Sequence, residues 1–245
     1  MRRPGTPGTA SDPAAGPRHA LRAMFNTVPR TYERVNHVLT LGLDVRWRRR
    51  AMELAVRGDE LVCVDVCTGT GEMAGLLRGA VSSSCTVMGL DFSPAMLWQA
   101  IEAREGRIRW VSGDVTRLPL ASHTVDLVTV SFATRNLMLS REALEVALVE
   151  LRRVLRSGGR LMIVETSQPT NAVVRRLFHL YVRVVVKPVG KLVSGTASPY
   201  AYLSRTILRF PDARELKVML EGAGFSRVEF TSLSAGAAAV HIAHT

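Results

Sequence analysis

An arginine and an asparagine end the segment "TVDLVTVSFATRN", whose long apolar run predicts a buried strand. Arg135 and Asn136 therefore stand at the carboxyl end of that strand, where an arginine typically holds an anion or a polar ligand. Because arginine stays protonated at neutral pH, it would stabilise an oxyanion or orient a water rather than act as a base. A competing interpretation pairs Arg135 with an acid such as Glu165 or Asp126, which would brace two strands.

A glycine turn in "VDVCTGTGEMA" forms a second candidate site, directly after another predicted strand. Gly69, Thr70 and Gly71 would let a ligand approach backbone N–H groups at a helix start. The spacing also fits a dinucleotide fingerprint, with Asp91 where a ribose-binding acid is expected. However, Asp65 lies inside the strand beside the turn, and its carboxylate would repel a pyrophosphate but suits an ammonium group.

A third acid, Asp114 in "SGDVTRLPL", follows the next predicted strand. Successive strand ends thus carry Asp65, Asp91 and Asp114. Three such carboxylates suit a ligand with a cationic amino acid, a ribose diol and an adenine amine. This pattern favours S-adenosylmethionine over a nicotinamide cofactor as the ligand, although strand-end acids can also simply cap helices and turns.

Strands and helices alternate from Leu61 onwards. Strands are expected in "LVCVDVC", "CTVMGLD", "RIRWVSGD", "TVDLVTVSF" and "RLMIVET", and their continuous β-branched runs indicate parallel strands covered on both faces. Helices are expected from about Glu72 to Arg78, in "SPAMLWQAIEARE" with Ser93 as N-cap, and in "REALEVALVELRRVLRSGG". The last of these is expected to stop at Gly158-Gly159.

The remaining segments predict one α/β domain. Residues 1–18 are rich in Pro, Gly and Ala without an apolar core, which predicts a disordered leader rather than a signal peptide. Residues 19–245 are expected to form a doubly wound sheet with a helical N-terminal lead and a helical insertion at about 169–208. A helix in "DARELKVMLEGAGF" and two strands, "SRVEFTSL" and "AAAVHIAH", joined near Ala235-Gly236, would close the domain.

The composition allows a full core to be buried, in one large domain or one domain with appendages. Of 245 residues, 47% are hydrophobic and 22% charged, and the net charge is +11. The basic excess is almost entirely arginine, because the lysines are only Lys187, Lys191 and Lys217. Positive charge favours nucleic acid, anionic lipid or acidic ligands without choosing among them, and arginine bias can also reflect genome composition.

The cysteines and histidines suggest neither disulfides nor a metal. An odd number of cysteines, two of them inside a predicted strand, and the lack of zinc-type spacing indicate small buried side chains in a reducing cytoplasm; they are Cys63, Cys67 and Cys85. The histidines show no partner at ligand spacing, so no metal site is expected; those considered are His37, His179 and His241.

Taken in order, these motifs resemble the class I S-adenosylmethionine-dependent methyltransferases and, more narrowly, the UbiE/MenG family of quinone-biosynthesis C-methyltransferases. The resemblance runs from about Phe25 to the C-terminus and rests on "FNTVPRTYERVNHVLTLGLDVRWRR", "SFATRNL", "LMIVETSQP" and "ASPYAYLSRTILRFPDARELKVMLEGAGF". It implies a Rossmann-like, mostly parallel seven-stranded sheet whose last strand is antiparallel.

The resemblance also implies a reaction. A methyl group would pass from S-adenosylmethionine to a ring carbon of a prenylated hydroquinone, either demethylmenaquinol or a methoxy-benzoquinol. Catalytic roles fall on Tyr32, Arg135 and Asn136; acceptor-binding roles fall on Asn36, Tyr200 and Tyr202, for which helix packing is the competing interpretation. Beyond the turn and the strand-end acids, cofactor contacts are expected from Thr68, Phe92, Val115 and Ser131.

The chain departs from the family pattern at several positions, none of which removes an obvious chemical group. They are Pro29, Glu33, Cys67-Thr68, Glu72, Thr134 and Arg205-Thr206. Thr134 and Arg205 leave substrate preference open, so a methyltransferase for another small molecule or lipid is the nearest alternative. A nucleic-acid methyltransferase is disfavoured because "SFATRN" replaces the [DN]-P-P-[YF] of base-amine enzymes. An NAD enzyme and a non-enzymatic ligand-binding protein are the remaining alternatives.

The segment from Val173 to Val193 is apolar but interrupted by Arg175, Arg176, Arg183 and Lys187, so it does not predict a membrane span. It would suit a lid that receives an isoprenoid tail, with a cationic edge for anionic lipid heads. An amphipathic core helix is the alternative. A cytoplasmic enzyme is expected, with peripheral membrane contact and a homodimer both left open.

Overall fold

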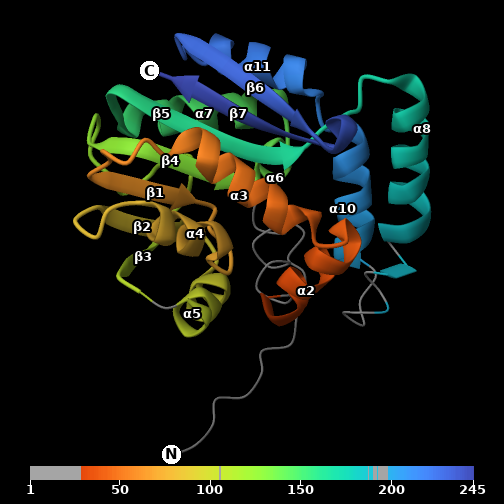
Figure 1. Cartoon of the computed structure of the whole chain (residues 1–245), viewed down its shortest axis with the longest axis horizontal. Coiled ribbons are helices and arrows are strands. Elements are labelled where there is room, and N and C mark those ends of the chain that lie inside the picture. The colour runs from red at the N-terminus through yellow and green to blue at the C-terminus, as the bar shows by residue number, and fades with distance from the viewer. Residues whose placement is uncertain (1–28, 105, 187, 190–191, 193–197) are drawn as a thin grey trace, which may run out of the picture.

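The computed structural model describes residues 29–104, 106–186, 188–189, 192 and 198–245 (Figure 1). The leader expected at 1–18 lies outside these residues. Side chains are described from Val35 onwards in the first helix and from Ala201 onwards in the helix that begins at Ser198.

One seven-stranded sheet runs through the molecule in the order β3-β2-β1-β4-β5-β7-β6 (Figure 1). Its strands are β1 (Val62–Val66), β2 (Thr86–Asp91), β3 (Ile108–Ser112), β4 (Val125–Ser131), β5 (Leu155–Thr166), β6 (Arg227–Leu233) and β7 (Ala238–His244). β1 to β5 pair in parallel, whereas β7 is antiparallel to both β5 and β6. The predicted doubly wound sheet with an antiparallel last strand is confirmed. The strand order reverses between β1 and β4, and ligands of such sheets bind outside the carboxyl ends at that point.

The described helices either pack on the two faces of this sheet or lie at its carboxyl edge. They are α2 (Pro29–Thr40), α3 (Leu43–Ala55), α4 (Glu72–Ala80), α5 (Pro94–Ala103), α6 (Thr134–Leu137), α7 (Arg141–Val154), α8 (Ala172–Tyr181), α10 (Ser198–Arg209) and α11 (Ala213–Gly222). A π-helical turn, η1 (Val182–Val186), follows α8, and a 3₁₀ turn, η2 (Ser234–Gly236), joins β6 to β7.

Two apolar layers hold the sheet. On one face, α3 and α4 pack against strand residues such as Cys63, Leu127 and Met162. On the other face, α7 and α11 pack against residues such as Val64, Val128 and Ile163. Alternate residues of each central strand thus enter opposite layers, which explains why these strands read as unbroken apolar runs. Cys63 and Cys85 are free and buried, as expected, whereas Cys67 is only partly buried.

Several helix starts follow from local sequence. Ser93 accepts a hydrogen bond from Met96 N with Pro94 in the first turn of α5, as predicted. Asp212 and Glu215 form a reciprocal capping box at the start of α11. These caps satisfy N–H groups that a helix leaves unpaired, so the boundaries are fixed locally.

One predicted helix end is wrong. The helix expected to stop at Gly158-Gly159 ends at Val154, and Leu155 already pairs with Val125 in the sheet. The two glycines instead form an irregularity in β5, after which pairing resumes between Leu127 and Arg160. Gly158 has a φ of 74°, and a Cβ on Gly159 would lie 2.8 Å from the Arg156 carbonyl oxygen. The glycines mark a sharp excursion of the strand rather than a helix end.

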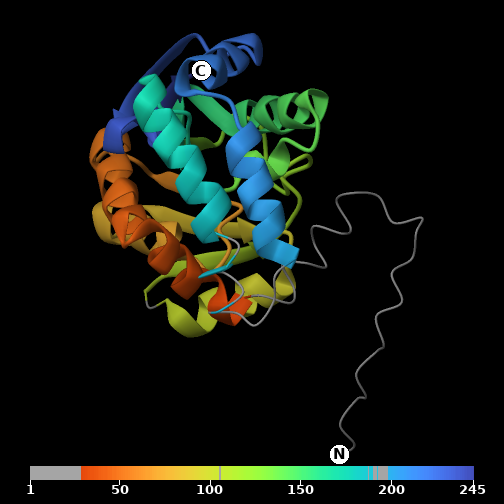
Figure 2. The ribbon, with the colours of Figure 1, turned by 90° about the vertical axis from the view of Figure 1, so that its right-hand side faces the viewer.

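A third apolar cluster joins the N-terminal helix to the late insertion. Val35 and Leu39 of α2 pack with Val182 and Val186 of η1 and with Ile207 of α10. Figure 2 shows α8 and α10 side by side in front of the sheet, next to α2. Among the described residues no helix is both long and apolar enough to cross a bilayer. α2, α8, η1 and α10 are called the lid below.

Candidate active site

A cavity lies over the carboxyl ends of β1, β2 and β4, where the strand order reverses. It contains most of the predicted cofactor residues: Thr68, Gly69, Thr70, Asp91, Phe92, Asp114, Val115 and Ser131. Asn136, expected to be catalytic, also lines it. We call this space the cofactor cavity.

The glycine turn forms the floor of the cofactor cavity. Gly69 has a φ of 56° with open space where a Cβ would stand, so its backbone is accessible to a ligand. Gly71 is the N-cap of α4 with a φ of 80°, and a Cβ there would lie 2.6 Å from the Trp110 ring. Gly71 does not line the cavity but permits this turn. The helix start therefore faces the cavity as predicted.

Asp91, at the end of β2, binds the glycine turn through hydrogen bonds to its carboxylate. Its carboxylate accepts hydrogen bonds from Gly69 N at 2.8 Å and from Ser93 N at 2.9 Å. The side chain is buried, and burial raises the pKa of Asp91 to about 6 despite these bonds. A buried carboxylate at a cavity wall gains by accepting further donors, which fits a ribose diol.

Asp65 is placed differently from the expectation of direct ligand contact. Its oxygens accept from Thr68 Oγ1 at 2.5 Å and from Thr129 Oγ1 at 2.7 Å, and it is not among the residues that line the cavity. Burial raises the pKa of Asp65 to about 6. The carboxylate therefore lies behind Thr68, and it would act on a bound ligand through its field and through that hydroxyl.

Asp114 stands at the exposed rim of the cofactor cavity. It accepts from both the backbone N and the hydroxyl of Thr116 at 2.8 Å. Phe92, Met96 and Val115 line the same cavity and provide apolar surface next to this acid. An apolar slot with a carboxylate at its edge suits an adenine ring and its amine. The residues present thus fit each part of S-adenosylmethionine.

We predict that the affinity for S-adenosylhomocysteine, which shares the amino-acid, ribose and adenine parts of S-adenosylmethionine, falls between pH 7 and pH 5. Asp65 and Asp91 have pKa values raised by burial to about 6, so both take up protons in this range in the free protein. The ligand's ammonium and hydroxyl groups prefer the carboxylates, so Kd should rise roughly tenfold from pH 7 to pH 5. Titration calorimetry measures this directly.

The control is Asp65→Asn, which should bind more weakly at pH 7 and show a smaller pH dependence. The same raised pKa values have an opposite sign for folding. Each group adds stability below the unfolded pKa and loses it as pH rises through about 6, so the free protein carries a penalty at neutral pH. An equal Kd at pH 5 and pH 7 would contradict the prediction.

Two non-glycine residues with left-handed backbone flank the cavity. Cys67 follows β1 with a φ of 56°, and Phe132 follows β4 with a φ of 53°. This conformation is costly for bulky residues, and such strain concentrates at functional sites. The Phe132 ring lies between Trp47, at 6.1 Å between centroids, and the Arg48 guanidinium, 4.8 Å above the ring.

A second, apolar cavity opens beneath the lid. Its wall includes Asn36, as predicted, with Phe178 and Tyr181 of α8, Val182 of η1 and Ile207 of α10. Arg48 and Phe132 line both this space and the cofactor cavity, so the two cavities adjoin at these residues. We call it the acceptor cavity.

Arg135 and Asn136, in α6 after β4, line different cavities. Arg135 lines the acceptor cavity and Asn136 the cofactor cavity, and both are buried. Arg135 Nη1 pairs with Glu165 Oε1 at 2.6 Å, so the competing expectation of a strand-bracing pair is confirmed. Asp126 instead pairs with Arg156. The ion pair orients the guanidinium and does not exclude a role at the acceptor.

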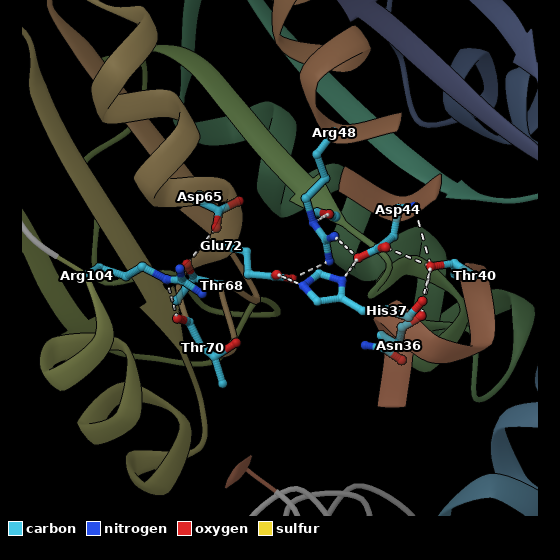
Figure 3. A network of polar contacts seen from close by, with 11 residues as sticks. Asn36, His37, Thr40, Asp44, Arg48, Asp65, Thr68, Thr70, Glu72 and Arg104 are labelled. Carbon is cyan, nitrogen blue, oxygen red and sulfur yellow. Dashed lines mark hydrogen bonds and ion pairs between the residues drawn. The ribbon is translucent and has the colours of Figure 1, made fainter. Parts of the chain in front are cut away.

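A charged network connects the cavities (Figure 3). Arg48 bonds Asp44 Oδ2 at 2.7 Å, Glu72 Oε2 at 2.8 Å and Ser131 Oγ at 3.1 Å. No sequence pattern distinguishes Arg48, because three neighbouring arginines share its helix. In the sequence, Glu72 stands out only as a departure from the family pattern. Helix packing brings Arg48 and Glu72 together where the cofactor cavity meets the acceptor cavity.

His37 joins this network, although the sequence shows no partner at metal-ligand spacing for it. Its Nδ1 lies 2.7 Å from Asp44 Oδ2 and its Nε2 lies 3.3 Å from Glu72 Oε1 (Figure 3). His179 likewise meets Gln168, and His241 meets the Ala213 carbonyl oxygen. Sequence spacing missed the His37 partners because they belong to other helices.

Of the three tyrosines predicted to act at the site, the structure describes the side chain of Tyr202 alone. Tyr202 is half-buried beside Arg205, and burial raises its pKa while the charges of Arg135 and Arg205 oppose that rise. The side chains of Tyr32 and Tyr200 lie outside the described residues. Their roles stay predictions.

Solved structures share this architecture. A Thermotoga maritima S-adenosylmethionine-dependent methyltransferase matches with a TM-score of 0.65 at 18% identity, covering 91% of this chain and 99% of that one. Human N-acetylserotonin methyltransferase, solved with S-adenosylmethionine, matches with a TM-score of 0.60 at 18% identity, covering 90% and 58%. The sheet order and the cavity at its reversal point, together with these matches, define the fold of the class I S-adenosylmethionine-dependent methyltransferases.

Sequence relatives identify the family to which the chain belongs within this fold class. Residues 16–245 match the ubiE/COQ5 methyltransferase family, and the chain belongs to that family. Demethylmenaquinone methyltransferase of Thermus thermophilus is 36% identical over 222 residues, covering 89% of this chain and 98% of that protein. The Staphylococcus aureus protein of the same name is 35% identical over 224 residues, covering 90% and 91%.

Proposed function

We propose that this methyltransferase transfers the methyl group of S-adenosylmethionine to a ring carbon of demethylmenaquinol. The observation that carries the proposal is the apolar acceptor cavity, which adjoins the cofactor cavity at Arg48 and Phe132. A prenylated ring needs an apolar pocket for its body and a polar contact for its hydroxyl. The named relatives favour demethylmenaquinol over a methoxy-benzoquinol as the acceptor.

The donor, when bound, supplies a methyl group on a positively charged sulfur. Thr68, Gly69 and Asp91 would hold its amino-acid and ribose parts and fix the direction of the methyl group. Phe132 and Arg48 would set the boundary across which the methyl group faces the ring. Holding both partners in line removes much of the entropic barrier to displacement.

Arg135 would act on the acceptor. A ring carbon becomes nucleophilic as an adjacent hydroxyl loses its proton, and a guanidinium stabilises the resulting oxyanion. Arg135 lines the acceptor cavity and is held in place by Glu165. Asn36 of α2 lines the same cavity and can orient the oxygen through its amide.

A direct assay tests the proposed function. Purified protein with S-adenosylmethionine should methylate reduced demethylmenaquinone and act more slowly on a methoxy-benzoquinol, with mass spectrometry locating the methyl group on carbon. Turnover of the benzoquinol alone would transfer the proposal to that substrate. Binding of S-adenosylmethionine without methylation of either quinol would favour a different small-molecule acceptor.

The outer face of the lid supports peripheral contact with an anionic membrane. Val173, Leu177, Leu180 and Val184 recur at helical spacing and are 57–64% exposed. Arg175, Arg176 and Arg183 are exposed among them, and α8 has no acidic residue. The opposite side of the same segment, at Phe178, Tyr181 and Val182, lines the acceptor cavity. Apolar side chains flanked by cations fit a bilayer surface of anionic lipid, next to the entrance for a lipid-soluble acceptor.

We predict that Leu177→Ser with Leu180→Ser weakens co-sedimentation with phosphatidylglycerol vesicles at low salt by about tenfold, because two apolar anchors are lost. The matched control is Val146→Ser with Val149→Ser, which changes two exposed apolar residues of α7. Equal loss in both variants, or no binding by the original protein, would contradict the contact.

A further inference from the structure

Asp44 is a buried acid in the wall of the acceptor cavity, and the methyl transfer described above gives it no role. Among the described residues that line this cavity it is the one acid. The charged neighbours in the same wall, Arg48 and Arg135, only donate hydrogen bonds, whereas hydroxyl and amide groups such as that of Asn36 can donate or accept. A carboxylate only accepts, so Asp44 is the group in this wall that demands a donor on the ligand.

The two carboxylate oxygens of Asp44 are unequally satisfied (Figure 3). Oδ2 accepts hydrogen bonds from Arg48 Nη1 and from His37 Nδ1, both at 2.7 Å. Oδ1 lies 2.7 Å from the Thr40 hydroxyl, but that hydroxyl is also 2.8 Å from the Asn36 carbonyl oxygen, and its single hydrogen serves one acceptor at a time. Because Thr40 and Asp44 both line the acceptor cavity, Oδ1 retains capacity for a further donor at the cavity wall.

Asp44 keeps its negative charge in this buried position. Burial alone would raise the pKa of Asp44, but the Thr40 hydroxyl and the Arg48 guanidinium outweigh burial and hold the pKa below its ordinary value. Arg48 lies one helical turn away on α3, so this pair also fixes the direction of the carboxylate. The acceptor cavity therefore presents a fixed acceptor on α3 and, separately, the guanidinium of Arg135, whose ion pair is with Glu165.

The reduced and oxidised forms of a para-quinone differ in their hydrogen-bonding groups. Both oxygens of the quinol carry a hydrogen and can donate, whereas both oxygens of the quinone are carbonyls that only accept. Arg135 can bind an oxygen of either form, but Asp44 binds a hydroxyl and repels a carbonyl oxygen. A site built to bind a hydroxyl rejects the analogue that lacks it, because its own buried group is then left without a partner.

We propose that Asp44 makes the acceptor cavity selective for the reduced ring, because its Oδ1 accepts a hydrogen bond from one quinol hydroxyl while Arg135 meets the other oxygen. The inference rests on the proposed function for the identity of the acceptor and adds the residue that distinguishes its redox states. With one oxygen held as a hydroxyl and the other stabilised as an oxyanion, the two side chains favour the mono-anion, in which the ring is electron-rich. The quinone ring is not nucleophilic, so its exclusion keeps an unreactive form out of the site.

Binding of the methylated ring tests this selectivity without turnover. The probe is 2-methyl-3-prenyl-1,4-naphthoquinone, used as the quinone and as its quinol, because this ring has no position left to methylate. Anaerobic equilibrium dialysis, with the protein saturated with S-adenosylhomocysteine, should give a Kd about 10–100-fold lower for the quinol than for the quinone. Equal affinities would overturn the inference and leave the proposed function standing. If neither form bound, the proposed function would fail and the inference with it.

Asp44→Asn should remove or reverse this preference. The asparagine oxygen can still accept from Arg48, whereas its N–H₂ group can donate to a quinone carbonyl. The Kd of the quinol should rise and that of the quinone should fall, so that their ratio changes by at least about tenfold. A purely structural role of Asp44 would weaken both forms alike, and that result would overturn the inference.

The matched control is Asp126→Asn. Asp126 is also buried and paired with an arginine, Arg156, but it lies near the amino end of β4 and lines neither cavity. This variant should keep the quinol preference of the original protein. Loss of the preference in both variants would show a general effect of the substitution and overturn the role of Asp44. The comparison of quinol with quinone in the original protein needs no variant, so it is decisive even if Asp44→Asn fails to fold.

Discussion

Replacing Arg135 with alanine should lower both stability and turnover. The guanidinium forms a buried ion pair with Glu165 at 2.6 Å, so Arg135→Ala leaves an unpaired buried carboxylate. We expect the free energy of unfolding to fall by about 3–5 kcal/mol. Loss of an oxyanion donor should also reduce kcat by about 100–1,000-fold. Chemical denaturation and single-turnover kinetics measure the two effects.

A double variant separates the two roles of Arg135. In Arg135→Met with Glu165→Gln no charge is left unpaired, and the Gln oxygen can still accept from Thr166 N, which now bonds Glu165 at 2.8 Å. Stability should return to within about 1–2 kcal/mol of the original, because breaking one partner of a buried pair costs more than removing both. Turnover should stay low. A double variant that regains both stability and turnover would show that Arg135 only braces the strands.

Replacing Asp91 with asparagine should raise the Kd for the product S-adenosylhomocysteine about 100-fold or more. The carboxylate accepts from Gly69 N and Ser93 N, and asparagine offers one oxygen where two are used. One N–H of the turn then faces an amide N–H₂, and the ribose loses a charged acceptor. Hydrogen bonds to charged groups contribute about 1.5–3 kcal/mol each, which gives the expected loss. Titration calorimetry with the product measures it.

The matched control for Asp91→Asn is Asp212→Asn. Asp212 also accepts from two backbone N–H groups, those of Arg214 and Glu215 at 2.8 Å, but it caps α11 away from the cofactor cavity. Asparagine is an equally good N-cap, so this variant should bind the product normally. Similar weakening in both variants would mean that the loss is a general effect of the substitution.

The sequence determined the sheet and the cofactor half of the site. Strands and their connecting helices are set by apolar period and by local caps such as Ser93, so they can be recognised without knowing the fold. The carboxyl ends of parallel strands share one edge of the sheet. The sequence therefore predicts that Asp91, Asp114 and the Gly69 turn lie in one site. The prediction that a helix ends at Gly158-Gly159 was wrong because a glycine pair is equally compatible with a helix end and with a strand irregularity.

Only the tertiary structure decided the acceptor half. The junction joins His37 of α2, Arg48 of α3 and Glu72 of α4, whose meeting depends on how three helices pack. Nothing in their spacing predicts it, because side-chain pairing between helices is fixed by packing angle and distance rather than by sequence separation. The same holds for Arg135, where two interpretations were open and only the observed contact with Glu165 showed that the guanidinium is paired. Local periodicity carries no information about which distant partner a buried charge finds, whereas the cost of burying it alone ensures that it finds one.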